Sequence, residues 1–85
     1  MHLLVADIEA DGLLDTIKNI WQVSVAEKID GEWVLESYNR GTLQAGLDRL
    51  HAADKVVGHH FLGYDVPAIK AVTGVQIPTT KIIDT

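Results

Sequence analysis

The chain has 85 residues, of which 47% are apolar, and it carries a formal net charge of −5 with no cysteine. These values allow one small domain and exclude a disulfide framework or a cysteine-ligated zinc site. No apolar run reaches the roughly 20 residues that cross a bilayer, and nothing suggests a signal peptide, so we expect a soluble, cytoplasmic protein with no membrane partner. The acidic balance argues against a passive nucleic-acid binder, which normally gathers lysine and arginine on one face.

The first predicted element is a strand over residues 3–8. It begins with the run Leu-Leu-Val-Ala, in which polar and apolar side chains do not alternate. A short, continuous apolar run is typical of a strand that is buried on both faces. Gly12 then ends the pattern.

A hairpin follows. Alternating side chains predict a half-buried antiparallel strand over residues 20–29, and residues 32–38 form its returning partner. The dipeptide Asp-Gly at 30–31 predicts a type I′ turn, which needs positive φ at both central positions. We expect Trp21 and Trp33 to pack in the core or across the strands, with an exposed tryptophan that stacks on a base as the alternative.

The next segment predicts a helix and a short strand. Thr42 can cap the helix, which continues to about Ala53, and Gly46 is its weak point because glycine lowers helix stability. Residues 55–58 then return as a strand.

A second helix is predicted over residues 66–73. Asp65 can cap it, Pro67 lies in its first turn, and Gly74 can end it. A further strand begins at Lys81. The order of elements predicts an α/β fold with a mixed sheet, antiparallel in its first three strands and followed by helix, strand and helix.

Two carboxylates at the end of the first strand are the candidate site. Asp7 and Glu9 point to the same face of the strand, roughly 6.5 Å apart along the chain. Unpaired carboxylates beside an apolar strand are costly, and hard divalent cations would remove most of that cost. The alternative is a pair of solvated acids without function.

The segments 7–14 (Asp-Ile-Glu-Ala-Asp-Gly-Leu-Leu) and 57–67 (Val-Gly-His-His-Phe-Leu-Gly-Tyr-Asp-Val-Pro) carry a family resemblance. They resemble the first two motifs of the DnaQ-like 3′–5′ exonucleases, which are ribonuclease H-like and of the DEDD type. Within that group the chain is most similar to the N-terminal proofreading domain of phage-type family A DNA polymerases. The similarity runs in order over nearly the whole chain.

The resemblance implies two-metal hydrolysis with Mg²⁺ or Mn²⁺ as two ions, and single-stranded DNA 3′ ends as the substrate. The implied catalytic and metal-binding residues are Asp7, Glu9 and Asp65. The implied substrate-binding residues are Leu13, Leu14, His60 and Tyr64. His60 stands where the family commonly has asparagine. We do not expect His59 and His60 to form a metal site, because adjacent residues of a strand face opposite ways.

The third motif of the family is absent from the sequence. We therefore expect residues 1–85 to be a single domain that is the N-terminal part of an exonuclease domain, truncated before the last motif. The expected protein partner is a polymerase domain or the missing C-terminal segment. Asp84 resembles a residue that opens the next helix and is not predicted to be a ligand. The alternative is a non-catalytic α/β folding fragment or interaction module of the same ancestry.

Overall fold

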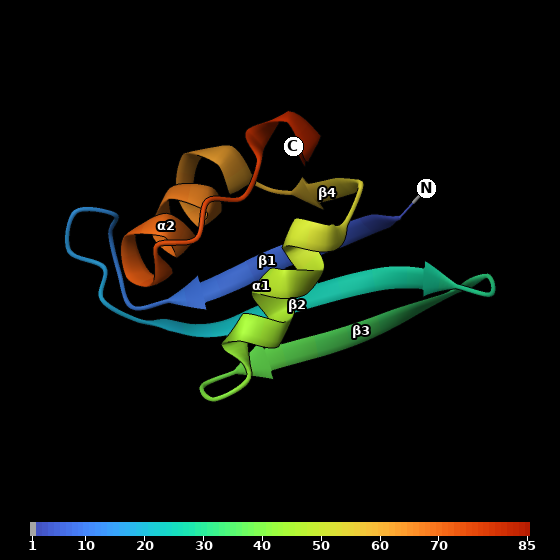
Figure 1. The fold of residues 1–85 in the computed structure, drawn as a ribbon, viewed down its shortest axis with the longest axis horizontal. Coiled ribbons are helices and arrows are strands. Elements are labelled where there is room, and N and C mark those ends of the chain that lie inside the picture. Colours follow the sequence, from blue (N-terminus) through green and yellow to red (C-terminus); the bar gives the residue numbers. More distant parts are fainter. Residues whose placement is uncertain (1) are drawn as a thin grey trace.

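The computed structural model describes residues 2–85 as one five-stranded sheet with helices packed on it (Figure 1). The strands are β1 (Leu3–Ala10), β2 (Ile20–Ile29), β3 (Glu32–Asn39), β4 (Lys55–Gly58) and β5 (Ile82–Asp84). The helices are α1 (Leu43–Ala52), the π-helix η1 (Phe61–Asp65), α2 (Val66–Thr73) and the 3₁₀-helix η2 (Thr79–Lys81). No helix in this described part is long and apolar enough to cross a membrane.

The sheet has the strand order β3-β2-β1-β4-β5, with β1 at its centre. β1 pairs antiparallel with β2, and β2 pairs antiparallel with β3. β4 and β5 are parallel to their neighbours, because helical crossovers precede them. The predicted α/β fold is therefore confirmed, and its mixed sheet is consistent with a ribonuclease H-like core.

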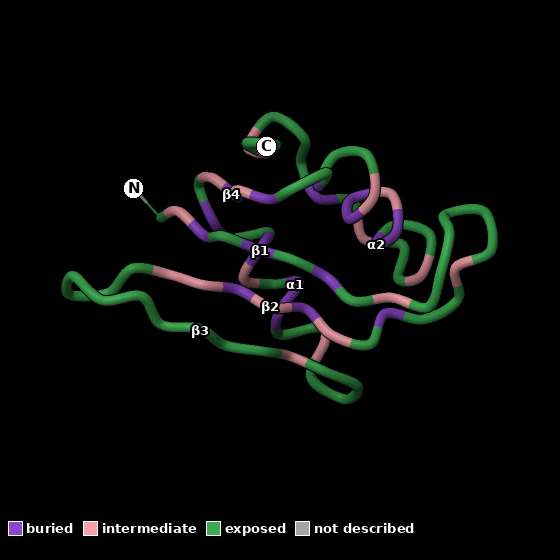
Figure 2. Tube along the Cα trace, turned by 180° about the vertical axis from the view of Figure 1, so that it is seen from behind, coloured by how far each residue is buried: buried purple, intermediate pink, exposed green. Residues whose placement is uncertain are grey.

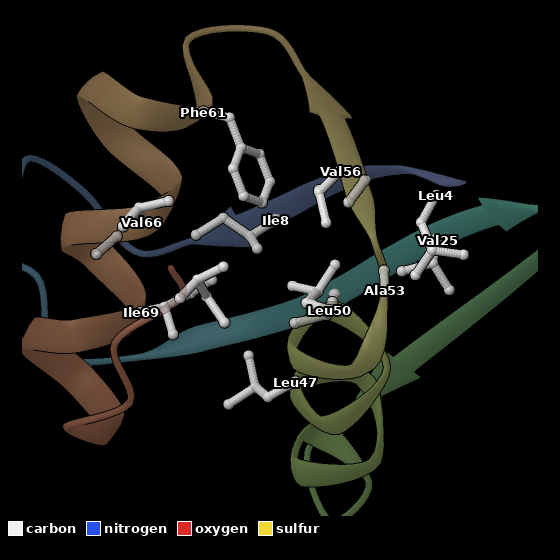
Figure 3. Close-up of a cluster of buried hydrophobic side chains, with 14 of the residues drawn as sticks. Leu4, Ile8, Val25, Leu47, Leu50, Ala53, Val56, Phe61, Val66 and Ile69 are labelled. Carbon is white, nitrogen blue, oxygen red and sulfur yellow. The ribbon is translucent and has the colours of Figure 1, made fainter. Parts of the chain in front are cut away.

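Both α-helices pack on the same face of the sheet. α1 contributes Leu47 and Leu50 to the core, and α2 contributes Ile69. These side chains meet Leu4 and Ile8 of the central strand in one cluster (Figure 3). The hydrophobic core is thus a single layer between the sheet and the two helices.

The opposite face of the sheet, which carries Val5, Asp7 and Glu9, is called the open face below. All three side chains are exposed, whereas Leu4 and Ile8 on the other face are buried. The prediction that the first strand is buried on both faces is therefore wrong, because both helices cover one face. Seen from behind α1, β1 alternates between buried and exposed residues and β3 is exposed along nearly its whole length (Figure 2).

The two tryptophans lie outside the core. Trp21 is 49% exposed and Trp33 is 57% exposed, so the expected packing in the core is wrong, and packing across the strands stays a prediction. Trp21 is the extra residue of a β-bulge, since Glu9 pairs with Gln22 but the next residue of β1 pairs with Ile20.

Gly46 allows α1 to pack closely against β3. A Cβ atom on Gly46 would lie 2.9 Å from Cδ2 of Tyr38 in β3, so only glycine lets the helix approach this ring. Thr42 makes no side-chain cap to α1; its hydroxyl accepts a hydrogen bond from the backbone N–H of Asn39 instead. The guanidinium of Arg49 then ties the helix to the sheet through Glu27 (2.8 Å).

The hairpin turn is confirmed. Asp30 has φ 50° and Gly31 has φ 83°, both in the left-handed region that a type I′ turn requires. A β-branched residue is strained at such a φ, whereas asparagine tolerates it.

We predict that Gly31→Val lowers the free energy of unfolding by roughly 1–3 kcal/mol, because valine cannot adopt this φ without strain. Gly31→Asn is the matched control and should lose much less. Urea denaturation followed by tryptophan fluorescence measures both. Equal stability of the two variants would mean that the turn does not constrain the hairpin.

Candidate active site

Asp65 is the buried carboxylate of the structure, with 4% of its surface exposed. It ends η1, where α2 begins. The backbone N–H of Ile8 donates a hydrogen bond to its Oδ2 (3.0 Å). Because Ile8 lies between Asp7 and Glu9, this bond brings Asp65 beside the strand that carries the other two predicted carboxylates.

Asp65 does not cap α2 as predicted. The helical segment starts earlier, at Phe61, and Asp65 already has helical backbone angles. The cap comes from Asp84 at the end of β5, which accepts hydrogen bonds from the backbone N–H groups of Phe61 (3.0 Å) and Leu62 (3.1 Å). Sequence reasoning missed this role; the acidic residue that directly follows the apolar pair 82–83 was its only signal.

The electrostatics of Asp65 follow from its position. Burial, which disfavours the charged form, raises the pKa of Asp65 from its ordinary value to about 7. The nearby charges of Asp7 and Asp84 raise the pKa further, while the hydrogen bond from Ile8 lowers it. The carboxyl group is therefore poised between its protonated and ionised forms near neutral pH.

Asp7 and Glu9 lie on the open face, as the alternation of β1 predicted. Each is paired with a polar residue of β2, Asp7 with Ser24 and Glu9 with Gln22. The structure brings Asp65 close to Asp7. Within residues 2–85, however, no three His, Asp or Glu side chains come together as a group that could hold a metal ion.

The loop after β1 is held at both ends. Asp11 accepts hydrogen bonds from the backbone N–H groups of Lys18 (3.0 Å) and Asn19 (3.1 Å) and from the Asn19 side chain (2.9 Å). These bonds, led by that from Lys18, lower the pKa of Asp11. The hydroxyl of Tyr64 donates to the carbonyl of Gly12, which joins the loop to η1. Sequence reasoning did not identify Asp11.

The predicted substrate-binding residues lie on the loop after β1, in η1 and just before η1. Leu13 and Leu14 are exposed on the loop, and Tyr64 is half-buried because its hydroxyl reaches that loop. His60 is exposed after the end of β4. Leu13, Leu14 and Tyr64 are thus gathered on one loop and the helix beside it.

The two histidines do not lie in a strand. β4 ends at Gly58, and His60 has the left-handed φ of 51°, so the reason given for their opposite orientation is wrong. Their ring centroids are 4.4 Å apart in an edge contact. Gly58 makes room for the turn: a Cβ atom there would lie 2.4 Å from Cδ1 of the buried Phe61.

Comparison with known proteins shows that the chain is similar in sequence to a DNA polymerase. Over 98% of its length, in an alignment of 93 residues, it is 34% identical to a DNA-directed DNA polymerase of Enterobacteria phage T3. The chain is a distant homologue of this polymerase. It spans 13% of the length of the phage protein. No protein-family model matches the chain.

We predict that the buried charge of Asp65 makes stability fall as the pH rises. The pKa of Asp65 in the folded state, about 7, is above the ordinary value of 3.8, so the folded protein holds this proton more tightly than the unfolded chain. Stability from this group is therefore full below about pH 4 and is lost as the pH rises through about 7. Asp65→Asn should be more stable than the parent at pH 8 and should vary less with pH.

Urea denaturation at a series of pH values measures this effect. Asp15→Asn removes an exposed carboxylate from the loop and serves as the control. It should leave the pH dependence of the parent unchanged. The assignment to Asp65 is wrong if Asp65→Asn keeps the same fall in stability between pH 4 and 8.

Proposed function

We propose that this chain is part of a metal-dependent 3′–5′ exonuclease of the proofreading kind, which acts on DNA within a polymerase-type protein. The observation that supports the proposal is the hydrogen bond from Ile8 to Asp65, because it brings a buried carboxylate to the strand segment that carries Asp7 and Glu9. The distant homology to a phage DNA polymerase agrees with this function.

The donor atoms suit a hard divalent cation. Asp7, Glu9 and Asp65 offer carboxylate oxygens, which Mg²⁺ and Mn²⁺ prefer over the nitrogen and sulfur ligands typical of zinc. The charge of Asp7 helps to raise the pKa of Asp65, so a cation bound by this pair would relieve an existing repulsion. Asp7 and Asp65 would hold the metal, and Glu9 would join them on binding, since the three side chains do not form one cluster within residues 2–85. Bound ions would supply an activated water and stabilise the leaving 3′ oxygen.

The loop between β1 and β2 would hold the end of the DNA strand. Leu13 and Leu14 expose apolar surface there, on which the terminal base and sugar can pack. Asp11 and Tyr64 fix the loop through the hydrogen bonds described above. A surface that is already ordered loses little conformational entropy when the substrate binds.

A non-catalytic module of the same ancestry is the second candidate. It is favoured by the lack, within residues 2–85, of a three-residue group that could hold a metal. Asp84, the remaining nearby carboxylate, has both oxygens engaged by the amides of η1, which leaves it poorly suited to act as a further ligand. Metal binding separates the two candidates.

We predict that Mn²⁺ or Mg²⁺ raises the melting temperature of the chain. A ligand that binds only the folded state stabilises it by RT ln(1+[L]/Kd), which is about 2.7 kcal/mol at a hundredfold excess over Kd. Asp7→Asn should stabilise the metal-free protein, since it removes a repulsion, and should abolish the response to metal. Asp48→Asn, on the exposed side of α1, should keep the response. A melting curve that does not change in millimolar Mn²⁺ would exclude the site.

We predict that the chain alone degrades single-stranded DNA slowly or not at all, because three carboxylates anchor two ions poorly. A chimera in which residues 1–85 replace the matching segment of the T3 polymerase should remove nucleotides from 3′ ends. Asp7→Ala should abolish this activity in the chimera, whereas His51→Ala on α1 should not. An end-labelled oligonucleotide with Mn²⁺ reports the products. Internal cuts, or removal from the 5′ end, would contradict the exonuclease assignment.

A further inference from the structure

The open face carries a continuous apolar row that crosses the whole sheet. Its members are paired in register from one sheet edge to the other, and each points to the face opposite the helices. The apolar row consists of Ile83, Val57, Val5, Ala26 and Leu35. Ile83, Val5 and Leu35 are exposed, and Leu35 has 70% of its surface in contact with solvent. Contiguous exposed apolar surface of this kind marks a site of association.

Opposite charges flank the apolar row. On one side lie Lys28, two residues after Ala26 in β2, and Lys55, two residues before Val57 in β4. On the other side lies Asp7, paired with Ser24 and, through it, with Ser37. Along one flank of the apolar row the open face therefore carries two lysines beside Leu3 and Trp33, and along the other flank it is acidic or polar.

We propose that the open face is the interface of a symmetric dimer, in which a second copy of this chain covers the first. A two-fold axis along the apolar row stacks that row on its own copy. The same rotation exchanges the two flanks, so that Asp7 of one copy faces Leu3 of the other, with Lys28 and Lys55 on the strands to either side of it. The surface is thus complementary to itself in both shape and charge, as a two-fold interface must be.

Two further observations favour a second sheet as the cover. The parallel strands β4 and β5 carry apolar side chains on both faces, Val56 with Val57 and Ile82 with Ile83, as is typical of strands that are covered on both faces. Two sheets pack face to face about 10 Å apart with their strands nearly aligned. The two-fold axis along the apolar row, which runs across the strands, produces two stacked sheets with aligned strands.

The proposed dimer does not depend on the exonuclease proposal, but it would affect the proposed metal site. Asp7 would lie under the second copy, so the dimer would withhold this carboxylate from metal and DNA. Dimerisation and Mn²⁺ binding should then oppose each other. Dimerisation is followed by sedimentation and Mn²⁺ binding by thermal melting. Each can therefore be measured when the other is lost.

Sedimentation velocity of the 85-residue chain over a range of concentrations tests the dimer. The parent should shift from monomer to dimer as the concentration rises. Leu35→Glu places two carboxylates on the two-fold axis and should raise the dissociation constant by at least about tenfold. Leu13→Glu is the matched control, because Leu13 is as exposed (73%) but lies on the loop after β1. It should dimerise like the parent.

Charge reversal tests the arrangement of the two copies. Lys28→Glu should weaken the dimer, whereas Lys70→Glu makes the same change in net charge on the exposed side of α2 and should not. Adding both Asp7→Lys and Lys55→Glu to Lys28→Glu should restore association, because all three charges of the contact are then reversed and meet again across the interface. Restoration would not follow if these residues lie apart in the dimer.

Three outcomes overturn the proposal. The first is a chain that remains monomeric at every concentration. The second is a dimer that Leu35→Glu and Leu13→Glu weaken equally. The third is hydrogen exchange in which dimerisation protects the outer amides of β3, since this would show pairing of two edge strands instead of contact between two open faces.

Discussion

The hydrogen bond between the Ile8 amide and the Asp65 carboxylate joins the central strand to the start of α2. It satisfies an amide of β1 beyond the last residue that pairs with β4. It also keeps Asp65 buried beside Asp7, which raises the pKa of Asp65 to about 7. The same contact therefore supports the packing of α2 on the sheet and holds the Asp65 carboxylate close to that of Asp7. A change that breaks this hydrogen bond would alter both the packing of α2 and the pKa of Asp65.

Local patterns were sufficient to predict the framework. Alternation along residues 20–29 and the Asp-Gly turn predicted the hairpin, and the positive φ of Gly31 confirms it. The spacing of Asp7 and Glu9 placed both on one face of β1, as the structure shows. These features depend on residues close together in the sequence, where backbone geometry leaves few alternatives.

Features that depend on distant parts of the chain were not predictable in this way. The apolar run of β1 does not reveal that both helices cover one face and leave Val5 exposed. The bulge that turns Trp21 outward follows from a shift in register between β1 and β2. Asp84 reaches the amides of η1 across 22 or 23 positions, a partnership that no short motif encodes. Sequence patterns report local geometry, and tertiary packing decides the rest.

The separation of Ile8 and Asp65 by 57 positions has a kinetic consequence. Contacts between distant residues form only after the entropy of closing the intervening loop has been overcome, so they tend to appear late in folding. The hairpin of β2 and β3 can form from neighbouring residues, whereas the carboxylates can meet only when α2 docks. An incompletely folded chain would thus contain every residue of the candidate site and still lack the site, and the proposed nuclease chemistry would be confined to molecules that have finished folding.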